Sequence, residues 1–285
     1  MTVLVTGTSG HLGRLTVLAL LERGVPAGEI VATARDLDKV ADLAERGVVV
    51  RRADYTDPAS LDAAFAGVDR AVLVSSNAVG SRVDDHRNVI EAAARAGVGL
   101  LGYTSILNAE TGGLVLAQDH LATEDLLRSS GVPFTLLRNG WYLENYTENT
   151  APALATGQVV GSAGEGRVSA AARRDYAEAA AAVLAGGEHA GAVYELAGDE
   201  AFTMTEYAAA LATATGQEIG YTDLPAAEYA AILESAGVPG PFAAVLADSD
   251  TGIARGALQN DGGDLARLIG RPTTGLADVL RDVTA

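Results

Sequence analysis

The first thirteen residues constrain the fold more than any other stretch of this 285-residue chain. An apolar run at residues 3–5 leads into three glycines at a three-residue spacing, Gly7, Gly10 and Gly13, and an apolar helical pattern follows. This order predicts a buried strand, a tight turn and a helix start. Glycines let the backbone approach a ligand closely, and free N–H groups at a helix N-terminus attract anions. The pattern favours a dinucleotide-binding turn over a turn that is merely capped by glycines.

Strand-like and helical patterns alternate through the first half of the chain. Strands are expected at residues 3–6, 30–34, 48–51, 71–74, 100–104 and 134–137. Helices are expected from the glycine turn to 23, up to 46, near 61–65, and at 88–96 and 114–129, with stops at Gly24, Gly47, Gly97 and Gly131. Such alternation predicts an α/β fold with a doubly wound parallel Rossmann sheet, whose ligand lies at the C-terminal strand ends.

The pattern loosens after Arg138 into a region rich in glycine and alanine. We therefore expect a Rossmann domain for NAD(P) at residues 1–139, to which 168–197 returns, and a smaller, mainly helical substrate-binding lobe at 140–285. Within the second half, helices are expected near 175–184, 205–215 and 226–236, a strand at 192–196, and a Pro/Gly loop at 238–241.

Composition excludes several classes of function. The chain has no cysteine, which rules out disulfides, thiolate nucleophiles and redox dithiols, and its four histidines show no metal-ligand spacing. A net charge of −17 argues against nucleic-acid and anionic-membrane partners, and no stretch is apolar enough to span a membrane or act as a signal sequence. A cytoplasmic protein without a metal is expected.

Lys39 is the only lysine, and no tyrosine lies four residues before it. The Tyr-x-x-x-Lys pair of typical short-chain dehydrogenases therefore cannot exist here. Arg35 follows the second expected strand, 22 residues beyond Gly13, where a dinucleotide site selects its ribose. An arginine pairs with the 2′-phosphate of NADPH, although the adjacent Asp36 could compete, so NADPH is expected over NADH.

Polar residues follow the later strands at the same sheet edge. Ser75, Ser76 and Asn77 leave the fourth strand and form either a ribose contact or an ordinary polar turn. The hydroxyl group of Tyr103 follows in the fifth strand. His120 shares a helical stripe with apolar residues, so it is either a core histidine or a group that contacts the nicotinamide ribose or protonates a reduced oxygen.

The sixth strand leads into Asn139, Gly140, Trp141, Tyr142 and Glu144. The aromatic pair, which includes the only tryptophan, suits a flat apolar acceptor, and a packed hinge between lobes is the alternative. Arg173 either contacts a phosphate or substrate or caps the next helix.

The chain resembles the NmrA-like atypical short-chain dehydrogenase/reductases, and most of all the type 2 NAD(P)H:quinone oxidoreductases. The resemblance rests on matching strings along the whole chain. They are Thr-Gly-x-x-Gly-x-Leu-Gly at 6–13, Arg-x-Ala-Asp-Tyr at 51–55, His-Arg-Asn-Val-Ile at 86–90, Tyr-Thr-Ser at 103–105, Thr-Leu-Leu-Arg-Asn-Gly-Trp-Tyr-x-Glu-Asn-Tyr at 135–146, Tyr-Glu-Leu-Ala-Gly-Asp at 194–199, Leu-Ala-Asp-Ser-Asp at 246–250 and Leu-Ile-Gly-x-Pro-Thr-Thr at 268–274.

The resemblance implies direct hydride transfer from NADPH to a quinone stacked beside Trp141 and Tyr142. Flavin is not expected, because the chain has only one dinucleotide loop, and a homodimer through a helical face such as 88–96 is one possible assembly. The resemblance also implies the site. The residues expected to bind the cofactor are Gly7, Thr8, Ser9, Gly10, His11, Leu12, Gly13, Arg35, Ser75, Ser76, Asn77, Asn139, Gly140, Glu144 and Arg173. Those expected at the reacting acceptor are Tyr103, His120, Trp141 and Tyr142. The alternatives are a reductase of another conjugated acceptor, such as a dye or an enone, and a non-catalytic NADP-sensing regulator.

Overall fold

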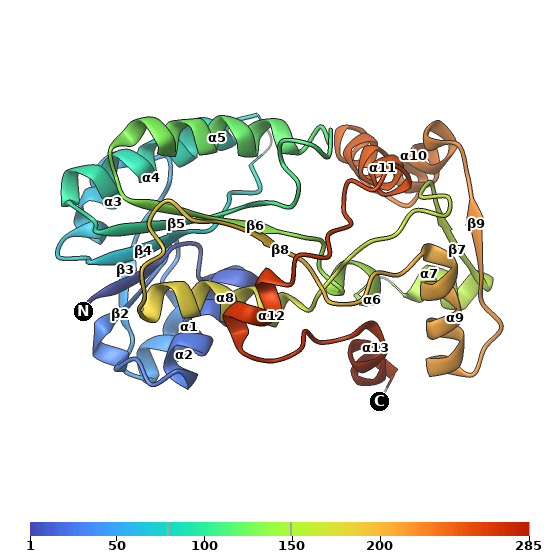
Figure 1. Cartoon of the computed structure of the whole chain (residues 1–285), viewed down its shortest axis with the longest axis horizontal. Coiled ribbons are helices and arrows are strands. Elements are labelled where there is room, and N and C mark those ends of the chain that lie inside the picture. Colours follow the sequence, from blue (N-terminus) through green and yellow to red (C-terminus); the bar gives the residue numbers. More distant parts are fainter. Residues whose placement is uncertain (79, 149, 285) are drawn as a thin grey trace.

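The computed structural model describes residues 1–78, 80–148 and 150–284, and a seven-stranded parallel sheet forms its centre (Figure 1). In chain order the strands are β1 (Val3–Val5), β2 (Ile30–Ala34), β3 (Val49–Arg52), β4 (Arg70–Leu73), β5 (Leu100–Ile106), β6 (Phe134–Asn139) and β8 (Val193–Leu196). Their spatial order is β3-β2-β1-β4-β5-β6-β8, which reverses between β1 and β4. This is a doubly wound Rossmann-type sheet, so the predicted fold class is confirmed.

Helices cover both faces of the sheet (Figure 1). One layer contains α1 (His11–Glu22), α2 (Ala41–Glu45) and α8 (Arg173–Ala185), and the other contains α3 (Pro58–Phe65), α4 (Arg82–Ala96) and α5 (Ala117–Ser130). Side chains of β1 alternate between them: Val3 and Val5 pack under the first layer and Leu4 under the second. Because both faces are buried at β1, this strand is apolar at every position, whereas the edge strand β3 ends in Arg51 and Arg52.

The segment around residues 173–196 lies with the first half of the chain. Strand β8 pairs with β6, and α8 packs against α1. Helix α8 thereby places its N-terminus, Arg173, at the same sheet edge as the glycine turn.

A third hydrophobic cluster holds most of the remaining elements together. They are α6 (Glu144–Thr147), α7 (Ala151–Thr156), β7 (Gln158–Gly161), α9 (Met204–Thr215), β9 (Gly220–Asp223), α11 (Gly240–Ala254) and α13 (Leu276–Thr284). Helix α10 (Ala226–Ser235) packs on α11, and α12 (Asp264–Ile269) packs on α8 in the core under the first helix layer. Two short 3-10 turns, η1 (Ala27–Glu29) and η2 (Asp38–Val40), flank β2. Among the described residues, no helix has the length and apolar character needed for a membrane span.

The structure corrects three details of the sequence prediction. Helix α4 begins at Arg82 rather than near 88, because its first turn is polar and hides the apolar stripe. Of the expected Pro/Gly loop at 238–241, residues 238–239 lie between α10 and α11, but 240–241 already start helix α11, where proline is tolerated since the first helical N–H groups need no partner. Strands β7 and β9 pair in a second small sheet that the sequence did not predict.

Truncation of a buried side chain in strand β5 should destabilise the protein strongly. Leu101 of β5 is fully buried, so we expect Leu101→Ala to lower the free energy of unfolding by about 2–5 kcal/mol, because it removes buried apolar area and leaves a cavity. Val193 of the edge strand is 44% exposed, and Val193→Ala should cost at most about 1 kcal/mol. Urea unfolding measures both, and equal losses would contradict this assignment of the core.

Candidate functional site

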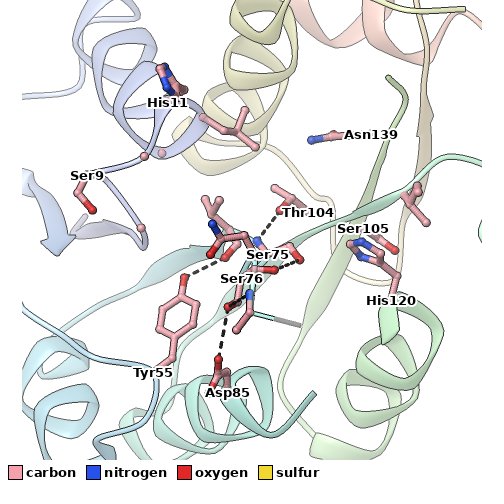
Figure 2. Close-up of a pocket in the computed structure, with 18 of the residues that line it drawn as sticks. Ser9, His11, Tyr55, Ser75, Ser76, Asp85, Thr104, Ser105, His120 and Asn139 are labelled. Atoms are coloured by element: carbon pink, nitrogen blue, oxygen red, sulfur yellow. Dashed lines mark hydrogen bonds between the residues drawn. The ribbon is translucent and has the colours of Figure 1, made fainter. Parts of the chain in front are cut away.

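A cleft of about 700 Å³ follows the C-terminal ends of strands β1 to β6 (Figure 2). On one side of the switch point its wall contains the glycine turn after β1 and Arg35 after β2. On the other side it contains His120 of α5 and Trp141, which follows β6. The strand order thus brings the separately predicted groups to one elongated site.

The glycine turn leaves helix α1 open to the cleft. A Cβ atom on Gly13 would lie 2.6 Å from the carbonyl oxygen of Gly7, so only glycine fits there. Gly7 has a φ of +63°, and Gly10 precedes the helix without a side-chain cap. Because the first N–H groups of α1 have no intrahelical partner, they form an anion-binding end that borders the cleft.

A network of hydrogen bonds around Tyr55 supports this turn. The Tyr55 hydroxyl lies 2.5 Å from Thr6 Oγ1 and 2.9 Å from the Val74 carbonyl oxygen, and Thr6 Oγ1 accepts the Val74 N–H. Because the Val74 carbonyl oxygen can only accept, the Tyr55 hydroxyl donates to it, and the Thr6 hydroxyl donates to Tyr55. This network therefore joins the ends of β1 and β4 to the segment that follows β3.

Arg35 lines the cleft after β2, whereas the adjacent Asp36 does not. The Asp36 carboxylate accepts the N–H of Asp38. Arg14, by contrast, is bound to both carboxylate oxygens of Asp42. Arg35 is therefore the cation that this part of the cleft offers to a ligand.

The loop after β4 is held by buried polar groups. The Ser75 N–H donates to Thr104 Oγ1 (Figure 2). The Ser76 N–H donates to His86 Nε2 at 2.9 Å. Since Nε2 of His86 accepts a hydrogen bond, its proton is assigned to Nδ1, which lies 2.9 Å from Thr123 Oγ1. Burial, helped by His120 and Arg82, lowers the pKa of His86 to about 3, so the ring is neutral.

His120 lines the cleft, and its ring is oriented by Tyr103. Nδ1 of His120 lies 2.8 Å from the Tyr103 hydroxyl, which also interacts with the hydroxyls of Thr123 and Ser75. We assign Tyr103 as the donor to Nδ1, which places the proton of the neutral ring on Nε2. Burial and then Arg82 lower the pKa of His120 to about 3. It is thus a neutral donor.

The last residue of β6 and two residues that follow it give the cleft an unpaired amide and an aromatic wall. Asn139 is 5% exposed, and neither its nitrogen nor its oxygen has a hydrogen-bond partner within the described chain. Trp141 and Tyr142 follow it along the cleft. An amide buried without partners in a cleft wall is costly, which suits a polar ligand group such as a carboxamide.

Glu144 acts on the cleft through Arg173 at the start of helix α8. Its carboxylate accepts the Arg173 N–H at 2.9 and 3.0 Å and so caps α8 from a different helix. The Arg173 guanidinium lies 5.2 Å from the ring centroid of Tyr142 and pairs with Glu148. Arg173 is held against the aromatic wall.

A buried ion cluster lies behind Ser105, another residue of the cleft wall. Ser105 donates to Glu124, which forms two hydrogen bonds with Arg138. Burial alone would raise the pKa of Glu124, but the hydrogen bonds from Arg138 and Ser105 outweigh it and lower that pKa. The charges of Glu124 and Arg138 compensate one another. Ser105 lines the cleft, but its hydroxyl proton is donated to Glu124.

Most predicted site residues line the cleft, but three do not. Thr8 turns its hydroxyl to the Thr33 carbonyl oxygen, Tyr103 is fully buried behind His120, and Glu144 caps α8. The sequence analysis did not include several residues that line the cleft. They include Tyr55, Asp85 and Asn145. Tyr55 and Asn145 belong to the matching strings at 51–55 and 135–146, and that position was their available signal.

Comparison with known proteins gives consistent results. A family model described as NAD(P)H-binding matches residues 7–186. The chain is 47% identical to Quinone oxidoreductase 2 of Escherichia coli over 97% of its own length and 96% of that protein. The crystal structure of that NADPH-dependent quinone oxidoreductase with NADPH superposes with a TM-score of 0.97 at 46% identity, covering both chains completely.

A second enzyme is also similar along its length. The Citrobacter triphenylmethane reductase in complex with NADP(H) has a TM-score of 0.94 and 35% identity, covering 99% of this chain and 100% of that one. NmrA has a TM-score of 0.80 at 15% identity, a likeness of fold alone. The resemblance inferred from the sequence strings is confirmed.

The two buried histidines should stay neutral across the physiological range. With pKa values near 3, we expect the imidazole signals of His86 and His120 in NMR spectra to remain unchanged between about pH 5 and 8. In the unfolded chain both histidines become protonated below about pH 6.5, whereas in the folded protein they stay neutral down to about pH 3. The contribution of the two neutral histidines to stability is therefore complete above about pH 6.5 and declines as the pH falls toward 3. A mid-range titration of either ring, with free imidazole as reference, would contradict this.

Proposed function

We infer that this chain, which belongs to the NAD(P)H-binding family, is an oxidoreductase that reduces a quinone with NADPH. The carrying observation is the single cleft that joins the glycine turn and Arg35 to His120 and the aromatic wall. The name of the relative that is 47% identical along nearly the whole chain agrees with the sequence-based expectation of NADPH-dependent quinone reduction.

The cofactor end is formed by the α1 N-terminus and Arg35. The free N–H groups of α1 receive the pyrophosphate, and Arg35 pairs with the 2′-phosphate that distinguishes NADPH from NADH. Local positive charge matters here because the chain carries a net charge of −17, which repels a polyanionic ligand. Asp36 does not line the cleft, and one of its carboxylate oxygens accepts the Asp38 N–H, which supports Arg35 as the cofactor contact.

The nicotinamide end is formed by residues after β4, β5 and β6. The unpaired amide of Asn139 meets the polar groups of the nicotinamide half, with Ser75 and Ser76 on the opposite wall. Arg173, fixed by Glu144 and Tyr142, contributes positive charge near the same place. The residues present therefore fit the cofactor.

Bound NADPH supplies the hydride, and the chain orients the acceptor and stabilises the charge that develops on it. Trp141 and Tyr142 offer flat faces to a quinone ring. The neutral Nε2–H of His120 donates a hydrogen bond to the quinone oxygen as it gains negative charge, and the proton that completes the hydroquinone comes from solvent. A neutral imidazole can serve as such an electrophile. Quinones are electrophilic enough for the missing Tyr-x-x-x-Lys pair to be unnecessary.

Reduction of a dye is the second candidate function. It is favoured by the 35% identity, over the whole chain, to a triphenylmethane reductase. Turnover of a quinone and of a cationic dye under the same conditions ranks the two acceptors.

Several sequence-based expectations remain proposals. We propose that the enzyme works without flavin or metal, in the cytoplasm, as a homodimer, and without nucleic-acid or membrane partners. The individual site roles and the division into a cofactor domain at 1–139 and a substrate lobe at 140–285 are proposals of the same kind. Mass measurement in solution and flavin analysis of the purified protein test the assembly and the cofactor content.

The function is tested by oxidation of NADPH with and without a simple benzoquinone. We expect quinone-dependent loss of the reduced-nicotinamide absorbance by flavin-free protein. Tight NADPH binding without turnover on any quinone or dye would favour a sensor and overturn the proposal.

Removal of the Arg35 guanidinium should weaken NADPH binding selectively. We expect Arg35→Ala to raise the KM for NADPH about tenfold or more, since it removes a charge-assisted bond, while the KM for NADH changes little. Arg14→Ala is the matched control, because Arg14 is already paired with Asp42. Equal loss for both cofactors would remove the assigned role of Arg35.

The donor role of His120 predicts an effect on turnover. His120→Phe should lower kcat about tenfold to a hundredfold without raising the KM for NADPH, because a donor to a developing oxyanion is lost. Tyr103→Phe should lower kcat less, since the ring remains but its tautomer is no longer fixed. His120→Gln, which keeps an N–H donor, should recover part of the loss. An unchanged kcat in His120→Phe would refute the role.

A further inference from the structure

The string Leu-Ala-Asp-Ser-Asp at 246–250 has no part in the cofactor cleft, yet it holds one of the walls. It lies on helix α11, and Oδ2 of Asp248 accepts the N–H of Val115 at 2.8 Å. Asp248 and Val115 are 133 positions apart in the chain. In Figure 1, α11 lies beside the end of the layer that contains α5.

Gly252, one helical turn further along α11, makes a second contact with the same segment. A Cβ atom at this position would collide with Cδ2 of Leu114, whose side chain is 3% exposed. Helix α11 therefore holds residues 114–115 both by a hydrogen bond to their backbone and by close apolar packing.

The held segment leads directly into the acceptor side of the cleft. Leu116, the next residue, lines the cleft and is the N-cap of α5, and His120 follows one turn later. Val115 itself is 51% exposed. Because the segment follows β5, it lies on the side of the switch point away from the glycine turn and Arg35. A shift of this segment would change the space for an acceptor more than the space for the adenosine half of a cofactor.

The other end of the same loop is anchored independently. Asn108, which has a φ of +52°, donates from its side chain to the carbonyl oxygens of Ala257 and Gln259, and its N–H donates to Glu195. Loss of the Asp248 contact would therefore release residues 114–116 while the loop stays attached at Asn108.

We propose that Asp248 is a specificity-determining residue. Its hydrogen bond to the Val115 N–H, here called the clamp, fixes residues 114–116 from helix α11, so that the wall formed by Leu116 selects acceptors by size. The inference rests on the proposed quinone reduction for its substrate class. With the clamp intact, the wall is rigid and favours small quinones. Without it, the wall yields to a bulky ring and holds a small ring less well.

The test compares kcat/KM for 1,4-benzoquinone and for a bulky substituted naphthoquinone. We expect Asp248→Ala to raise the ratio of bulky to small acceptor by about threefold or more, as expected for a lost hydrogen bond to a charged group, with the dissociation constant of NADPH within about twofold of wild type. Asp248→Asn keeps an oxygen that can accept the Val115 N–H and should retain the wild-type ratio. Gly252→Ala displaces Leu114 and should also alter the ratio.

Asp250→Asn is the matched control on the same helix. Asp250 accepts the Ser162 N–H, away from the wall, so the acceptor ratio should not change. Burial raises the pKa of Asp250 to about 6, although the Ser162 N–H opposes the shift, and Asp223 adds to it. Ionisation of Asp250 therefore costs more in the folded than in the unfolded chain, so it lowers stability as the pH rises from about 4 to 6 and above. The neutral amide should remove this cost and raise Tm at pH 8, which shows that the control substitution has an effect of its own.

Three outcomes would overturn the proposal. They are an equal loss for both acceptors, a matching loss of NADPH affinity, or the same ratio shift in Asp250→Asn. Failure of wild type to reduce any quinone would instead overturn the proposed function. The clamp is then read from the affinities of small and bulky hydroquinones, measured by fluorescence of Trp141, the only tryptophan. A changed affinity ratio in Asp248→Ala supports the clamp, and an unchanged ratio rejects it.

Discussion

The close approach of two glycines at the end of β1 is the constraint on which the site depends. A Cβ on Gly13 would lie 2.6 Å from the Gly7 carbonyl oxygen, so the helix can start this near the strand only without a side chain. The turn directs the unpaired N–H groups of α1 to the cleft and lets α1 pack on α8, whose first residue, Arg173, lines the same cleft. One steric requirement thereby places both the N–H groups of α1 and the Arg173 side chain at the cleft.

The acceptor side of the cleft relies on oriented neutral groups. Burial keeps His86 and His120 uncharged, and each ring accepts one hydrogen bond that fixes its tautomer. A neutral ring costs less to bury than an imidazolium, and it can still donate to a developing negative charge. The nearby charges of Glu124 and Arg138 are compensated by each other behind Ser105. The site is therefore suited to an electrophilic acceptor that needs little acid catalysis.

Local patterns predicted most of the fold and much of the cleft. The glycine spacing, Arg35 after the second strand and His120 on its helix could be located because each depends on its own segment. Tyr103 illustrates the limit of such local patterns. Its place in a buried strand does not reveal that its hydroxyl is bonded to His120 and does not face the cleft. Tyr55 and Asp85 were missed because their contacts come from other strands and helices.

The sequence by itself determined the strand–turn–helix unit, the parallel sheet and the kind of ligand, because periodicity and glycine spacing act within a few residues of each other. Only the tertiary structure decided which polar groups meet. The Ser76 N–H donates a hydrogen bond to His86, and the Val115 N–H donates one to Asp248, 133 positions further along the chain. Such pairs arise from the packing of whole elements, whose relative positions depend on the sum of many buried contacts and leave no local pattern in the chain.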